Sequence, residues 1–123
     1  GIFGKWHLGH HKEFLPLKQG FDEYLGLPYS NDMWPVKYDG KKYDENDPKA
    51  KRYPPLPLIE GDERIRTIET LEDQAELTTL YTERAISFIN KNRNTPFFLY
   101  IPHSMPHAPV AASAKFRGKS EQG

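Results

Sequence analysis

The sequence predicts an α/β fold in which one long amphipathic helix leads into a buried parallel strand. Apolar residues recur at helical spacing between residues 77 and 89, and every residue of the run 97–101 is aliphatic or aromatic. Only a short turn at 94–96 separates the two segments. Because a helix that passes through a short turn into such a strand is half of a parallel crossover, this pattern indicates an α/β architecture.

The first half of the chain is expected to be mostly loop. Residues 1–3 predict the end of a buried strand, which runs into a glycine-bounded loop at 4–9. Residues 10–35 hold too many prolines and glycines for a long regular element. We expect apolar side chains to anchor this segment to the core, namely Phe14, Leu15, Leu17, Phe21, Tyr24, Leu25 and Leu27. The polar residues 36–55 predict an exposed excursion.

A hairpin is expected after the excursion. The β-prone runs 56–59 and 64–68 flank a turn at Gly61. Pro57 has no backbone donor, which favours an edge position for the first of these strands.

The helix has recognisable signals at both ends. Thr70 stands three residues before Asp73, as in a capping box, and Lys91 and Arg93 lie near the C-terminal end, where positive charge suits the helix dipole. Pro96 follows and excludes continuation. One apolar face is predicted to pack against the core, made of Leu77, Leu80, Tyr81, Ala85, Phe88 and Ile89.

Composition limits both the possible functions of the chain and its ability to fold on its own. The 17 basic and 17 acidic side chains cancel, which removes a global electrostatic case for binding nucleic acid or an acidic membrane surface. No apolar run is long enough to span a bilayer, and the absence of cysteine excludes disulfides and thiolate metal sites. With 11 prolines and 37% hydrophobic residues the chain has few apolar residues for a core of its own, and its first residues already belong to a motif. We therefore expect an interior piece of a larger protein.

The first motif that can carry chemistry reads Gly4-Lys5-Trp6-His7-Leu8-Gly9. In an extended chain the side chains of Lys5 and His7 project to the same side, while Trp6 points into the packing. An ammonium group and an imidazole ring on one side of a loop suit the binding of an anion. The alternative interpretation is a surface lysine beside a half-buried histidine, with no shared function.

The second motif, Pro102 to Pro109, contains His103 and His107. It follows the predicted strand 97–101, and open α/β sheets place ligand sites beyond the carboxyl ends of their strands. A spacing of four would suit a helical metal pair, but the three prolines of this loop exclude a regular helix, and no further zinc ligands lie nearby in the sequence. The alternative interpretation is two solvated loop histidines.

These two motifs, with the segment Pro28-Tyr29-Ser30-Asn31-Asp32 between them, resemble the sulfatase family, close to its arylsulfatase-type branch. The resemblance touches most of the chain. It implies the alkaline-phosphatase-like α/β fold with a mostly parallel central sheet. Residues 1–123 would then be a partial sulfatase catalytic domain whose N- and C-terminal parts are missing.

The resemblance also implies roles for individual residues. Lys5 would bind the sulfate and steady the nucleophile, and His7 would hydrogen-bond that nucleophile. His107 would contact the sulfate and protonate the leaving oxygen. The hydroxyl of Ser30 would lie close to the sulfate, and His103 would orient the loop.

Two cofactors that the resemblance implies have no counterpart in this sequence. The family makes formylglycine from a cysteine in a Cys-x-Pro-x-Arg segment, and it binds a divalent cation, usually calcium, through paired acids and an Asp-Asn pair. Since neither set of residues is present, no metal ligand is assigned within the chain. We expect the isolated chain to be inactive.

The function that the resemblance implies is hydrolysis of sulfate esters of an aryl alcohol, a sugar or a glycolipid. A phosphonate or phosphate-ester hydrolase of the same superfamily is the alternative among enzymes, and a non-catalytic module that binds an anion or glycan is the alternative outside them. The implied partner is a sulfated small molecule or glycan, and a secreted or periplasmic location is favoured.

One geometric expectation follows. Because a sulfuryl group carries its charge on several oxygens, its donors must arrive from different loops. We therefore expect Lys5, His7, Ser30 and His107 to converge on one pocket. The side-chain tips of Lys5, His7 and His107 should fall within roughly 10 Å of one another, a span of two or three strand spacings.

Overall fold

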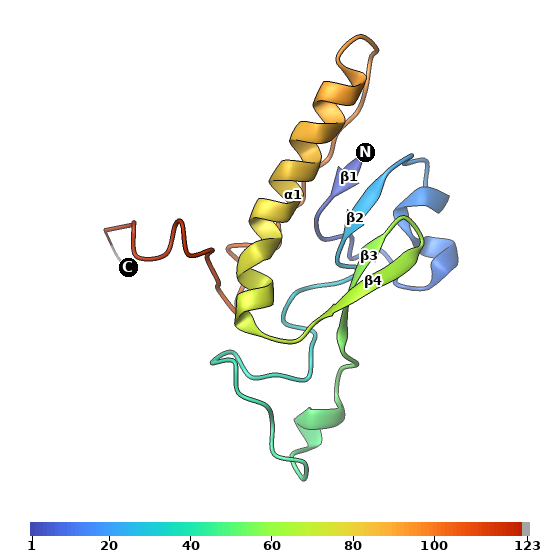
Figure 1. Cartoon of the computed structure of the whole chain (residues 1–123). Coiled ribbons are helices and arrows are strands. Elements are labelled where there is room, and N and C mark those ends of the chain that lie inside the picture. Colours follow the sequence, from blue (N-terminus) through green and yellow to red (C-terminus); the bar gives the residue numbers. More distant parts are fainter. Residues whose placement is uncertain (122–123) are drawn as a thin grey trace.

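The computed structural model describes residues 1–121 and shows one long helix packed against a small mixed sheet (Figure 1). The elements are β1 (Ile2–Phe3), β2 (Tyr24–Gly26), β3 (Leu56–Glu60), β4 (Glu63–Ile68) and α1 (Leu71–Asn92). Three short 3-10 helices lie in the loops, at Lys12–Phe14, Pro16–Lys18 and Pro48–Lys51. None of the helices in residues 1–121 combines the length and the hydropathy needed to cross a membrane.

The sheet is mixed, which corrects the expectation of a mostly parallel one. Its strand order is β1-β2-β3-β4, and only β1 and β2 run parallel. The predicted hairpin is confirmed as β3 and β4. The two strands of a hairpin pair in the antiparallel sense, and β3 also pairs antiparallel with β2, so two of the three strand pairings of this sheet are antiparallel.

The segment 97–101 confirms the parallel crossover but not its burial. The Phe3 amide donates to the Tyr100 carbonyl at 3.0 Å, and the Tyr100 amide donates to the Gly1 carbonyl at 3.0 Å, so the segment runs parallel beside β1. Four of its five side chains are nevertheless exposed, and Phe98 keeps 70% of its accessible surface, while Leu99 is partly buried against the core. The prediction of a fully buried strand is wrong for residues 1–121, because no described strand flanks the other side of this segment.

The expected edge position of Pro57 is also wrong, since β3 lies between β2 and β4. Only Ile59 and Glu60 of β3 pair with β2, so Pro57 has a strand on one side only, opposite Thr67. Its missing donor therefore interrupts no backbone hydrogen bond with β2. The three-residue strand β2 itself has no clear signal in the sequence, where residues 10–35 were predicted to be loop.

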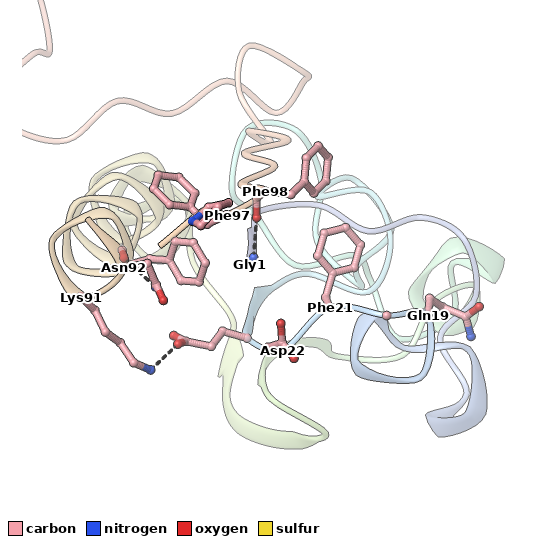
Figure 2. Close-up of a pocket in the computed structure, with 12 residues that line it drawn as sticks. Gly1, Gln19, Phe21, Asp22, Lys91, Asn92, Phe97 and Phe98 are labelled. Carbon is pink, nitrogen blue, oxygen red and sulfur yellow. Dashed lines mark hydrogen bonds and ion pairs between the residues drawn. The ribbon is translucent and has the colours of Figure 1, made fainter. Parts of the chain in front are cut away.

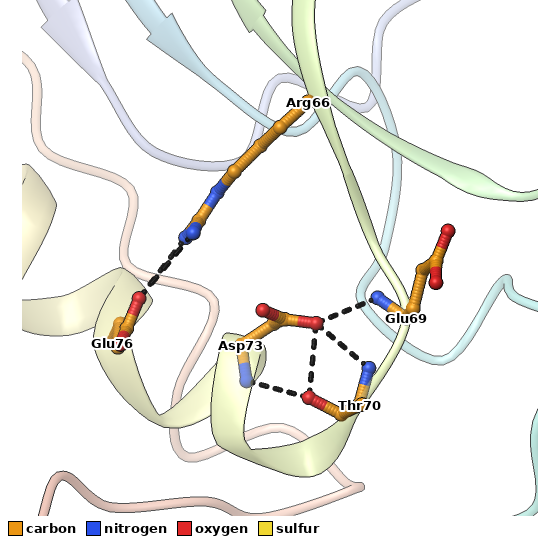
Figure 3. A network of polar contacts seen from close by, with 5 residues as sticks. All are labelled: Arg66, Glu69, Thr70, Asp73 and Glu76. Carbon is orange, nitrogen blue, oxygen red and sulfur yellow. Dashed lines mark hydrogen bonds and ion pairs between the residues drawn. The ribbon is translucent and has the colours of Figure 1, made fainter.

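The start of α1 is a complete capping box, as predicted (Figure 3). The Asp73 amide donates to Thr70 Oγ1 at 3.1 Å, and Asp73 Oδ2 accepts from the Thr70 and Glu69 amides at 2.9 and 3.0 Å. Partial burial acts to raise the pKa of Asp73, but these hydrogen bonds outweigh it and lower the pKa below its ordinary value. Arg66 on β4 pairs with Glu76 one turn further along, at 3.3 Å.

The predicted core positions are mostly confirmed. Leu77, Tyr81, Ala85 and Phe88 of α1 are buried against the sheet, whereas Ile89 is exposed, because it lies one position beyond the packed face. Among the expected anchors of residues 10–35, four are buried, namely Leu15, Tyr24, Leu25 and Leu27. Phe14 is exposed instead, on a short 3-10 helix with no buried residue.

Candidate functional site

The first motif continues the parallel ladder beyond the end of β1. The Gly4 amide donates to the Leu25 carbonyl, the Trp6 amide to Leu27 and the His7 amide to Pro28, at 2.9, 2.9 and 3.0 Å. On the opposite side, the Lys5 amide donates to the Pro102 carbonyl at 2.7 Å. The segment that carries Lys5 therefore lies between the segment that leads to Ser30 and the segment that leads to His103 and His107.

Two glycines allow this close approach of three backbones. A Cβ atom on Gly26 would lie 1.7 Å from the Gly4 carbonyl oxygen, and one on Gly4 would lie 2.2 Å from the Pro102 carbonyl oxygen. Gly4 also has a φ of 143°, which L side chains rarely adopt. The glycine that opens the first motif is therefore needed to bring the three segments together.

Lys5 is a half-buried cation without an acidic partner. No carboxylate of residues 1–121 lies within ion-pair distance of its ammonium group, and none of the hydrogen bonds among these residues uses it. Partial removal of a charge from water costs free energy unless a counter-charge compensates. This arrangement leaves Lys5 available to an anion.

His7 is exposed and has a φ of 60°, in the left-handed region. The expected alternation of side chains in an extended chain therefore ends at Trp6, because the backbone reverses at His7. Trp6 packs into the structure as predicted, and its ring meets Phe21 edge-on with centroids 6.1 Å apart. Left-handed residues other than glycine are uncommon and often mark functional loops, so the turn at His7 is consistent with a site here.

A buried amide pair joins the Ser30 segment to the His107 loop. Asn31 Nδ2 donates to Gln74 Oε1 at 2.9 Å and lies 3.2 Å from the His107 carbonyl and 3.3 Å from the Pro109 carbonyl. Gln74 Nε2 returns a hydrogen bond to the Asn31 carbonyl at 2.9 Å. Both side chains are fully buried. Helix α1 thus holds both loops through one polar contact.

Sequence reasoning missed these two residues. Gln74 does have a signal, because it lies in the same helical register as the buried residues Leu77 and Tyr81. A polar side chain on the apolar face of a helix needs a polar partner in the core. Asn31 lies inside the segment that carries Ser30 but had been given no role of its own.

Ser30 is 4% exposed, and its hydroxyl has no hydrogen-bond partner in residues 1–121. Leaving such a group unpaired costs about 1–3 kcal/mol. Asp32, two residues further along the chain, accepts no hydrogen bond from a described residue and lines a separate pocket.

The two histidines of the second motif lie in different surroundings. His107 is exposed, and its Nδ1 lies 2.6 Å from the Ala108 carbonyl, so Nδ1 carries the proton and Nε2 is left for other partners. The ring of His103 lies 6.2 Å from that of Tyr81 on α1. The structure therefore brings the backbone segments of Lys5, Ser30 and His107 together. The spacing of their side-chain tips stays a prediction.

The described residues do not fit a metal site. Within residues 1–121, no three His, Asp or Glu side chains come together as a metal ion would require. Calcium needs several oxygen ligands at once. No step proposed below uses a metal ion.

A pocket of about 580 Å³ lies at the other end of the parallel segments (Figure 2). Gly1, Asp22 and Phe97, which line it, lie where β1, β2 and the third segment begin. An ion pair joins two other residues of the lining, Lys91 and Glu23. This pocket is therefore remote from the carboxyl ends of the strands, where Lys5 and Ser30 lie.

Comparisons with known proteins agree with these motifs. The Sulfatase family matches residues 1–123. Mouse N-acetylgalactosamine-6-sulfatase is 39% identical over 130 residues, a match that covers 99% of this chain and 22% of that protein. The crystal structure of the PsFucS1 sulfatase from Pseudoalteromonas sp. is similar with a TM-score of 0.77 and 26% identity, over 97% of this chain and 26% of that one.

A second solved structure, Ps i-CgsB in complex with k-i-k-neocarrahexaose, has a TM-score of 0.57 and 27% identity, over 89% of this chain and 24% of that one. The chain thus spans about a quarter or less of the length of these relatives. The match to the family nevertheless extends over the whole of the chain, and the chain belongs to the sulfatase family.

Proposed function

We propose that residues 1–123 are part of the catalytic domain of an enzyme that hydrolyses sulfate esters. The observation that carries the proposal is the half-buried side chain of Lys5, which forms no ion pair with a carboxylate of residues 1–121 and whose backbone lies between the segments that lead to Ser30 and His107. An unpaired cation at the carboxyl ends of parallel strands suits an anionic group on a substrate.

In this proposal the donors of the site bind the sulfuryl oxygens. The Lys5 ammonium opposes the negative charge that these oxygens carry. The buried Ser30 hydroxyl donates to one of them and thereby gains the partner that it lacks. His7 binds the attacking group from the exposed turn.

His107 serves as the general acid. The S–O bond to the alcohol breaks as a new S–O bond forms to the nucleophile, and the departing oxygen takes the Nε2 proton of the His107 imidazolium, which leaves a neutral ring that keeps its Nδ1 proton. The hydrogen bond from Nδ1 to the Ala108 carbonyl fixes the ring so that Nε2 is the transferring atom. Family membership implies formylglycine as the nucleophile and calcium as a cofactor, both held by residues outside this chain.

The test is a substrate comparison in the complete protein, meaning the full polypeptide in which these 123 residues occur. Its kcat/KM is measured for 4-nitrophenyl sulfate, 4-nitrophenyl phosphate and a phenylphosphonate ester. We expect the sulfate ester to be the best substrate, and Lys5→Ala to lower its kcat/KM by about 10²–10³-fold. A preference for either phosphorus ester would favour the related hydrolase, and binding of sulfate without any turnover would favour a non-catalytic module.

A further inference from the structure

The excursion between Val36 and Tyr53 contains a pocket of about 420 Å³ next to the proposed sulfate site. Its lining combines aromatic rings with two cations: Trp34, Tyr38, Tyr43, Tyr53, Lys49 and Arg52. In Figure 1 the excursion extends away from the sheet, beyond the start of α1. Three of these rings, those of Tyr38, Tyr43 and Tyr53, belong to the excursion, whereas Trp34 is buried in the core.

Two ordered elements, a small hairpin and a 3-10 helix, form the walls of the pocket. Val36 and Lys42 form an antiparallel bridge, which makes a small hairpin. The tip of the hairpin packs on the first residue of α1, since a Cβ on Gly40 would lie 3.0 Å from Leu71 Cδ1. The opposite wall is the 3-10 helix Pro48–Lys51, capped by a hydrogen bond from the Lys49 amide to Asp47 Oδ1 at 2.9 Å.

Both cations are free to bind an anion. Neither Lys49 nor Arg52 forms an ion pair with any carboxylate of residues 1–121. The Arg52 guanidinium lies over the ring of Tyr53, 5.1 Å from its centroid, a stacking that orients the planar fork. Of the described residues that line the pocket, one, Asp32, is acidic, so the basic groups outnumber it. An arginine fork binds carboxylate or sulfate oxygens in pairs.

The pocket adjoins the proposed sulfate site along the chain. Asp32 lines it and lies two residues after Ser30, so their Cα atoms are at most about 7 Å apart. A substrate that places its ester sulfate beside Ser30 can therefore reach the pocket with the next sugar ring. Tyrosine rings offer apolar faces on which the carbon face of a sugar can stack.

We propose that this pocket binds an anionic substituent, a carboxylate or a second sulfate, on the sugar residue next to the one that carries the ester. The inference rests on the proposed function and narrows it, because it assigns an anionic oligosaccharide as the substrate class. Lys49 and Arg52 bind the anion, and the surrounding aromatic rings hold the sugar. Simple aryl sulfates lack this second contact.

The test compares substrates in the complete protein and in its Lys49→Ala/Arg52→Ala variant. The reference substrate is 4-nitrophenyl sulfate. One trisaccharide carries the ester sulfate beside a uronic acid, a second has that carboxylate reduced to an alcohol, and a third has a second sulfate in its place. The measured quantity is kcat/KM for each trisaccharide divided by kcat/KM for the aryl sulfate. Lys51→Ala is the matched control, because Lys51 lies on the same 3-10 helix but does not line the pocket.

The double variant is expected to lower this ratio about ten-fold for the uronic acid substrate, for the doubly sulfated one, or for both, and to leave the ratio of the reduced substrate unchanged. The substrate whose ratio falls identifies the anion that the pocket binds. Equal ratios in the wild type and the variant for both anionic substrates would overturn the inference, as would an equal loss in Lys51→Ala.

Calorimetric titration with the uronic acid trisaccharide supplies a readout that does not depend on turnover. Weaker binding by the double variant, with Lys51→Ala unchanged, supports the pocket even if no sulfate ester is hydrolysed. Equal binding by all three proteins overturns it. Absence of hydrolysis alone therefore counts against the proposed function and not against the pocket.

Discussion

The side-chain amide of Asn31 lies 3.2 Å from the backbone carbonyl of His107, although the two residues are 76 positions apart in the sequence. The same amide donates to Gln74 on α1, so the helix, the Ser30 segment and the His107 loop share one buried polar contact. Such a contact is costly when only partly satisfied, which makes it a strong determinant of the loop position. We therefore expect the position of the His107 loop to depend on this contact.

Replacement of the amide is expected to displace the proposed general acid. Asn31→Ala in the complete protein should lower kcat for a sulfate ester of an alkyl alcohol, whose departure needs a proton, by about 10²-fold, because small misplacements of a reacting group have effects of this size. Asn90→Ala is the control, since Asn90 is exposed on the same helix as Gln74. Unchanged kcat in a folded Asn31→Ala protein would show that this contact does not position His107.

The proton donor itself is tested by varying the leaving group. His107→Ala should reduce kcat/KM by about 10²–10⁴-fold for a sulfate ester of an alkyl alcohol, which needs protonation to depart. The loss should be smaller for 4-nitrophenyl sulfate, whose leaving group is already stable as an anion. Equal losses for both esters would instead indicate that His107 only binds the sulfate.

Steric replacement of the motif glycine tests the assembly of the site. Gly4→Ala should strongly impair both folding and activity, since its Cβ would overlap the Pro102 carbonyl oxygen and its φ is unfavourable for alanine. Gly20→Ala is a suitable control, because Gly20 also has a positive φ but no atom lies within 4 Å of its added Cβ. Thermal unfolding and aryl sulfate turnover would be measured together. Comparable behaviour of the two variants would exclude a special role for the contact with Pro102.

The helix cap makes a separate prediction about stability. Thr70→Ala should lower the free energy of unfolding of the complete protein by about 1 kcal/mol, measured by denaturant titration. Thr79→Ala, at an exposed position inside α1, should change it much less.

The same variant should move the pKa of Asp73 upwards toward its ordinary value. Since the folded-state pKa is lowered, the cap stabilises the protein fully above the unfolded value of about 3.9, and this contribution is lost as the pH falls through the lower folded value. An NMR titration of the Asp73 carboxyl group would measure the shift. An unchanged pKa in Thr70→Ala would contradict the assigned hydrogen bonds.

The isolated 123-residue chain is expected to be inactive and poorly stable. It contains no cysteine from which a formylglycine is made, and the ring of Phe98 at the sheet edge is 70% exposed. A parallel strand is ordinarily buried on both faces of its sheet. A sharp cooperative thermal transition, or reproducible hydrolysis of 4-nitrophenyl sulfate with or without calcium, would contradict this expectation.

Local signals in the sequence predicted local structure well. The capping box at Thr70, the hairpin around Gly61 and the parallel direction of residues 97–101 all follow from short-range chemistry, and all are present. The strand β2 and the mixed sheet were not predictable in the same way. Both depend on pairing between segments more than 20 residues apart, which no local pattern specifies.

In the candidate site, too, local motifs could be read from the sequence but long-range contacts could not. Motifs singled out Ser30 and His107, but the contact that joins their segments is made by Asn31 and Gln74, to which the sequence analysis gave no role. The expected burial of Phe97 and Phe98 failed because burial depends on neighbours that residues 1–121 do not provide.

The most direct test of the shared sulfate site is a crystal structure of the complete protein with sulfate bound. We expect one sulfate ion to lie within hydrogen-bonding distance of Lys5 Nζ, Ser30 Oγ and a ring nitrogen of His107. Because these donors come from three different segments, a single ion that contacts all three would require the convergence proposed here. Sulfate bound elsewhere, or Lys5 and His107 bound to separate ions, would contradict the account.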